Sequence, residues 1–66
     1  MKSGGIKFKN ISRILRKNGW MHDSTNGSHA KFKKDGKTIV VVVNSNGTNP
    51  IVWRRIVKEN NLDIHA

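Results

Sequence analysis

A single histidine among closely spaced lysines is the clearest chemical signal in this chain. Residues 26–34 read Asn-Gly-Ser-His-Ala-Lys-Phe-Lys-Lys. Imidazole can accept or donate a proton near neutral pH, and ammonium groups attract phosphate as point charges. Because side chains alternate along a strand, we expect His29, Lys31 and Lys33 to share one face. That face suits a phosphodiester substrate, and the plainer alternative is an exposed histidine beside a solvated edge.

Two dipeptides, Asn26-Gly27 and Asp35-Gly36, are predicted to turn the chain on either side of this segment. Both are strong hairpin signals because a type I′ turn needs positive φ at its two central residues. We therefore expect three antiparallel strands, at about residues 20–25, 28–34 and 37–43.

A two-residue loop at Asn26-Gly27 would place Met21 opposite Phe32, His22 opposite Lys31 and Ser24 opposite His29. His22 would then share the face of His29 and could act as a second acid/base group. An idle surface position is the alternative for His22. The same register leaves the large side chain of Trp20 on the open face.

The third strand is rich in β-branched residues. Ile39 and Val41 should join Ala30 and Phe32 on the buried face, because these positions alternate in register. Two valines, at positions 40 and 42, should then flank His29. They are either ordinary strand residues or the place where an inhibitory partner covers the site.

Helices are predicted before and after the strands. The first spans about residues 10–18, with Asn10 as its N-cap and Gly19 just beyond its end. Arg13 and Lys17 lie on its cationic face, which either follows a phosphate backbone or is simply solvated.

The second helix opens at Asn49-Pro50, where a capping side chain precedes a proline in the first turn. Arg54 lies outside the apolar stripe and could contact phosphate. The stripe, expected to face the core, consists of Val52, Trp53, Ile56 and Val57, with Leu62 and Ile64 in a tail docked beside it.

The order of elements indicates a small α+β domain in which both helices cover one face of the sheet. We expect residues 1–7 to form a flexible leader and residues 8–66 to form one domain. At 66 residues the chain is long enough for a single small core.

Charge points to a polyanionic partner. The chain has 13 Lys+Arg against 4 Asp+Glu, a formal charge of +9. Phosphate neutralisation and counterion release drive nucleic-acid binding, so RNA or DNA is the expected ligand. No cysteine is present, and the four acids are scattered, so we expect neither a metal site nor a cofactor. No signal peptide or membrane span is apparent, and a cytoplasmic location is expected.

Several of these features, taken in order, resemble the HicA family of toxin ribonucleases. They are Gly19-Trp20, the Gly-Ser-His-Ala-Lys-Phe run at 27–32, the valines at 40–43 and a second helix ending near Asn61-Leu62. The resemblance covers residues 8–64 and implies an α-β-β-β-α fold like that of double-stranded-RNA-binding domains (dsRBD-like). It also implies that His29 is catalytic and that a HicB-type antitoxin inhibits the protein. Residues 43–50 lack the histidine that the family often carries there.

The resemblance implies a toxin of a type II toxin–antitoxin system that cleaves mRNA, and the histidine, the lysines and the lack of a metal site predict that the cleavage is slow and independent of metal. His29 would act as a general base on a ribose 2′-hydroxyl. A non-catalytic dsRBD-like RNA-binding module is the alternative, and a small DNA-binding repressor is a third reading. The residues expected to contact RNA are Lys31, Lys33, Lys34, Arg13, Lys17 and Arg54.

Overall fold

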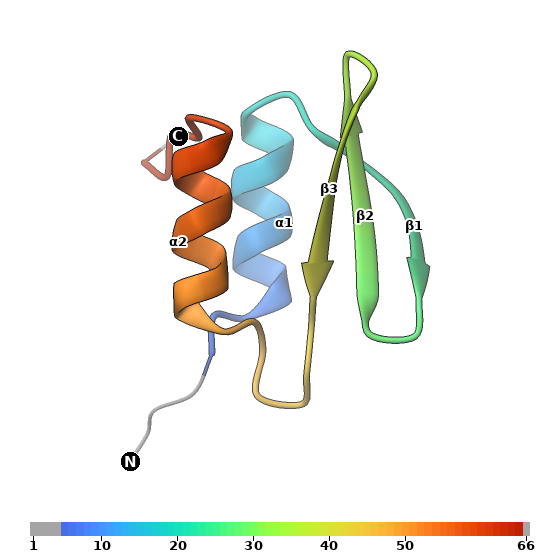
Figure 1. Cartoon of the computed structure of the whole chain (residues 1–66), viewed down its shortest axis with the longest axis vertical. Helices are drawn as coiled ribbons and strands as arrows, with labels where there is room; N and C mark the ends of the chain where they lie inside the picture. The colour runs from blue at the N-terminus through green and yellow to red at the C-terminus, as the bar shows by residue number, and fades with distance from the viewer. Residues whose placement is uncertain (1–4, 66) are drawn as a thin grey trace.

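Two helices lie on one side of a three-stranded antiparallel sheet in the computed structural model, which describes residues 5–65 (Figure 1). Strand β2 is central, with β1 and β3 at the edges. This architecture confirms the predicted α+β, dsRBD-like order. Along the chain the elements are α1 (Phe8–Lys17), β1 (Met21–Asn26), β2 (His29–Lys34), β3 (Lys37–Val42) and α2 (Pro50–Glu59).

The core lies between the helices and one face of the sheet. Phe32 and Val41 from that face are completely buried, as are Ile11 and Leu15 from α1. The expected alternation in β2 and β3 is therefore confirmed. The remaining buried apolar residues are Trp20, Ala30, Ile39, Trp53, Ile56 and Leu62.

Helix α1 begins two residues earlier than predicted, at Phe8, and Asn10 is not its N-cap. Lys7 occupies the cap position without a side-chain hydrogen bond, and Phe8 in the first turn packs against the core. The other end agrees with the prediction. Gly19 adopts φ 90°, which lets the Trp20 N–H reach the Leu15 carbonyl at 2.8 Å and closes the helix.

Helix α2 begins as predicted, because the Asn49 side chain accepts a hydrogen bond of 2.8 Å from the Ile51 N–H. The prediction is wrong for one residue of the apolar stripe and for one residue of the tail expected to dock beside it. Val52 is 38% exposed and Ile64 is 47% exposed. Trp53 and Ile56 are the buried residues of α2. Val52 lies at the rim of the stripe that they form.

The first hairpin turns one residue later than predicted. Asn26 pairs with His29, so the loop consists of Gly27 and Ser28. Gly27 alone has positive φ, 62°, which fits a type II′ turn with glycine in its first central position. A turn centred on Asn26 and Gly27 would have required positive φ at Asn26 as well. The glycine bears the unusual conformation at no steric cost.

A β-bulge at Asp23 changes the register again. Ser24 pairs with Lys31, but His22 pairs with Phe32, which leaves Asp23 as the extra residue in β1. A regular ladder from the same turn would face Asp23 toward the core and Trp20 toward water. The bulge instead leaves Trp20 only 3% exposed. Burying a tryptophan removes about 150–250 Å² from water, worth about 4–6 kcal/mol, and that gain favours the irregular strand.

The second hairpin is regular. Lys34 pairs with Lys37 across Asp35-Gly36, whose φ angles are 50° and 80°. Positive φ at both residues is the geometry of the predicted type I′ turn. The register of β3 against β2 is therefore set by the turn, and Val42 lies directly opposite His29.

Residues just before α1 pair with the loop that leads into α2. Ile6 and Thr48 form an antiparallel bridge, with both N–H···O distances at 2.8 Å. Gly5 donates to the Asn46 carbonyl at 2.7 Å. Gly5 and Ile6 belong to the stretch 1–7 that is predicted to form a flexible leader. Residues 1–4 of that stretch lie outside the part that the structure describes.

Candidate active site on the open sheet face

His29 is the first residue of the central strand and lies on the face of the sheet that the helices leave uncovered. Ala30 beside it faces the core, so alternation directs His29 the other way. Its direct cross-strand neighbours are Asn26 in β1 and Val42 in β3. The histidine is exposed, and a phosphodiester can reach it from solvent without displacing any part of the fold.

Lys31 and Lys33 follow His29 along the same face, as predicted. Lys31 is one face position away, roughly 7 Å along the strand, between Ser24 and the third strand. Its ammonium is therefore the cation best placed to meet a phosphate held at His29. Ser24 adds a hydroxyl in the same row.

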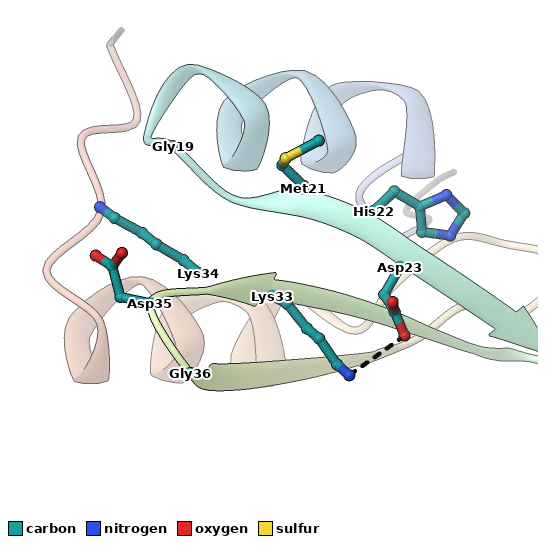
Figure 2. A pocket seen from close by; sticks show the side chains of 8 residues that line it. All are labelled: Gly19, Met21, His22, Asp23, Lys33, Lys34, Asp35 and Gly36. Atoms are coloured by element: carbon teal, nitrogen blue, oxygen red, sulfur yellow. Dashed lines mark ion pairs between the residues drawn. The ribbon is translucent and has the colours of Figure 1, made fainter.

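Lys33 has a partner of its own. Its Nζ lies 3.7 Å from Oδ2 of Asp23, the bulged residue (Figure 2), and both side chains are about half exposed. They help to line an open hollow of about 460 Å³ at the end of β2 far from His29. Because the carboxylate offsets part of its charge, Lys33 attracts phosphate less than Lys31 does.

Lys34 points in the opposite direction from Lys33 (Figure 2). Its Nζ donates a 2.8 Å hydrogen bond to the carbonyl of Asn18, the C-cap of α1. A cation at this position interacts favourably with the negative end of the helix dipole. The structure therefore gives Lys34 a role in the fold and does not bring it to the face of His29.

The prediction that His22 shares the face of His29 is wrong. The bulge places His22 opposite Phe32 on the helix side of the sheet, with the two ring centroids 5.1 Å apart. Phe8 of α1 lies at 5.9 Å on an edge, and His22 Nε2 is 2.7 Å from the Thr25 hydroxyl. From there His22 cannot take part in proton transfer at His29.

The basic residues predicted on the helices form a separate group. Arg13 and Lys17 line a hollow on α1 together with Arg16, and Arg54 is exposed on α2. Both helices cover the sheet face opposite His29. The structure therefore divides the predicted RNA contacts between two sides of the molecule, with only Lys31 and Lys33 on the face of His29 and only Lys31 adjacent to it.

Three residues of β1 are functional candidates that the sequence did not single out, namely Asn26, Ser24 and Asp23. Asn26 has the properties of a turn residue, and its place beside His29 follows only from the observed register. Asp23 became a partner of Lys33 because it bulges out of β1. No pattern in the sequence marks this bulge, because a residue is extra only relative to the strand with which it pairs.

Residues 5–65 hold no group of three or more His, Cys, Asp or Glu side chains arranged to bind a metal ion. Among the same residues, no helix is long and apolar enough to cross a membrane.

Comparison with known protein families places the chain. A family model described as the HicA toxin of bacterial toxin–antitoxin matches residues 8–61, which is most of the chain. The matched stretch contains both helices and all three strands in full. No curated protein and no solved structure matches significantly.

Proposed function

The chain belongs to the HicA family of bacterial toxin–antitoxin toxins, and we propose that it is an endoribonuclease that cleaves mRNA with His29 as its catalytic residue. The observation that carries this proposal is the exposed position of His29 at the start of the central strand, with Lys31 next to it on the same open face. A proton acceptor and a cation at this spacing are the two groups that cleavage of an RNA phosphodiester needs.

In the proposed reaction, the imidazole of His29 takes the proton of a ribose 2′-hydroxyl. The 2′-oxygen then attacks the adjacent phosphorus, and the bond to the 5′-oxygen of the next nucleotide breaks. The products are a 2′,3′-cyclic phosphate and a 5′-hydroxyl end. Lys31 stabilises the charge that develops on the non-bridging oxygens, and Asn26 offers an amide to the same group.

The departing 5′-oxygen also needs a proton. The position of His22 on the helix side of the sheet removes the imidazole that was predicted to share the face of His29. The proton therefore comes from water or from the imidazolium of His29 itself. One positioned acid/base group contributes about 10²–10⁴-fold to a rate, which fits a slow enzyme.

The nucleophile in this reaction belongs to the substrate, so the chemistry does not call for a metal-activated water. We propose that cleavage proceeds without metal, and that the partner protein of this toxin is a HicB-type antitoxin that blocks access to His29.

The test is cleavage of a labelled single-stranded RNA in excess EDTA by the parent chain, by His29→Ala and by His22→Ala. We expect the parent and His22→Ala to yield 2′,3′-cyclic phosphate ends, and His29→Ala to lose at least about 100-fold in rate. A DNA strand of the same sequence should stay intact, because it has no 2′-hydroxyl.

The lone imidazole also favours a second candidate, a non-catalytic RNA-binding module. RNA binding by all three proteins without any cleavage would support that alternative. Equal cleavage by the parent and His29→Ala would refute the assignment of His29. Cleavage by the parent that occurs only after Mg²⁺ is added would refute metal independence. The comparison of the parent with His29→Ala in Mg²⁺ would then test the assignment of His29.

A further inference from the structure

Strand β3 presents a free backbone edge next to the proposed active site. It is an outer strand of the sheet (Figure 1). The Val43 N–H donates to the Ser28 carbonyl at 2.7 Å, and antiparallel pairing alternates from that pair along the ladder. The backbone groups of Val41 and Ile39 therefore face β2. Those of Thr38, Val40 and Val42 face away from it.

One of these outward groups is satisfied within the chain. The Thr48 hydroxyl, on a fully buried residue, donates to the Val42 carbonyl at 3.0 Å. In the part of the chain that the structure describes, no hydrogen bond reaches the outward N–H and carbonyl groups of Thr38 and Val40. Both residues are exposed, so these groups are open to solvent or to another chain.

The two edges of the sheet differ in how they discourage pairing. Strand β1 carries the bulge at Asp23, which interrupts its ladder and places a charge on the edge. Strand β3 is regular over its whole length and carries apolar side chains on the open face, with Val40 44% exposed and Val42 37% exposed. A regular, apolar edge without a bulge is a site at which another strand adds readily.

We propose that the free edge of β3 pairs with an extended acidic segment of the antitoxin, which this toxin family implies as a partner. The inference rests on the proposed function, because it names how the partner reaches that active site. An added strand would lie about 4.8 Å beyond β3, hence roughly 10 Å from His29 in β2. Side chains of that strand on the open face would extend over Val42 toward His29 and block the approach of RNA.

Charge selects the kind of partner. The chain carries a formal charge of +9, and the open face next to this edge holds Lys31 and Lys33. A matching segment would present apolar, β-branched residues opposite the two valines and carboxylates toward the lysines. A second copy of this chain would bring another +9 to the same edge, so electrostatic repulsion disfavours self-pairing.

The first test compares Val40→Pro with Val40→Thr for binding to the purified antitoxin encoded with this toxin. Proline removes the outward N–H, which the ladder with β2 does not use, and fills the edge with its ring. Threonine keeps the N–H and the β-branched shape. We expect Val40→Pro to weaken binding at least tenfold relative to Val40→Thr. Equal affinity of the two variants would overturn the proposal.

The second test uses the parent chain and does not depend on whether Val40→Pro folds. Amide hydrogen exchange at Thr38 and Val40 should slow at least tenfold in the antitoxin complex, while Ile39 and Val41, already bonded to β2, serve as internal references. Unchanged exchange at the outward amides would rule out strand pairing. Protection of these amides in a toxin homodimer, without antitoxin, would show that the edge binds a second copy of the toxin and would refute the proposed acidic antitoxin segment. Both readouts measure binding, so a toxin that fails to cleave RNA would refute the proposed activity without affecting them.

Discussion

Deletion of Asp23 from the middle of β1 should leave the protein folded, although deletions inside strands usually reverse the facing of every residue beyond them. Asp23 is the extra residue of a bulge, and its removal brings His22 and Ser24 together opposite Phe32 and Lys31, their present partners. The faces of Trp20 and His22 are then unchanged. The loss is one exposed ion pair, worth at most about 1 kcal/mol.

Deletion of Lys31 is the matched control, because it removes one exposed residue from a regular part of the same sheet. It would turn Phe32, now completely buried, to the open face. Loss of about 150–250 Å² of aromatic burial costs about 4–6 kcal/mol. A domain of this size has a total stability of about 3–10 kcal/mol. We expect the control to be largely unfolded.

Urea unfolding followed by tryptophan fluorescence measures the outcome, since Trp20 and Trp53 are both buried. The Asp23 deletion should show a cooperative transition within about 1–2 kcal/mol of the parent. The Lys31 deletion should show little or none. If the Asp23 deletion showed no cooperative unfolding transition, like the control, the bulge would be essential for the packing of Trp20. The claim that deletion of Asp23 preserves the facing of β1 would then be refuted.

Three further substitutions test the roles assigned to single side chains. Thr48→Val keeps the shape of a buried residue but removes the hydroxyl that donates to the Val42 carbonyl. It should lower the free energy of unfolding, measured in urea, by about 1–2 kcal/mol, and a variant as stable as the parent would contradict this role. Lys34→Met, which loses the bond to the Asn18 carbonyl, should lower stability by up to about 1 kcal/mol and leave RNA affinity nearly unchanged in fluorescence anisotropy; a large fall in affinity would place this lysine on the RNA instead. Asp23→Asn removes the carboxylate that pairs with Lys33 on the open face. It should strengthen RNA binding at low salt, and the gain should disappear as salt is raised. Weaker binding by this variant would show that the carboxylate of Asp23 contributes to RNA binding.

Much of the fold could be predicted because local signals agreed with one another. Asp35-Gly36 fixed the second hairpin, Asn49 and the following proline marked the start of α2, and Gly19 marked the end of α1. In each case the backbone conformation at one or two residues has a strong chemical preference, and the alternating pattern on either side points to the same boundary. The face shared by His29 and Lys31 followed from that alternation.

The first hairpin was predicted wrongly because two neighbouring turns are nearly equivalent locally. Asn26-Gly27 and Gly27-Ser28 each place a glycine where positive φ is needed, and they differ by one residue in register. The choice depends on where Trp20 lies relative to α1 and on the bulge that lets it reach the core. Those are contacts between segments far apart in the chain, and local preferences do not contain them.

The sequence by itself determined the class of fold, the strong positive charge and the histidine and lysine that share a strand face. Only the tertiary structure decided which other groups join them. It removed His22 and Lys34 to the helix side, brought Asn26 next to His29 and left the edge of β3 unpaired. The reason is that side-chain facing within a strand follows from local alternation, whereas neighbours across strands follow from register, and burial of the core sets the register.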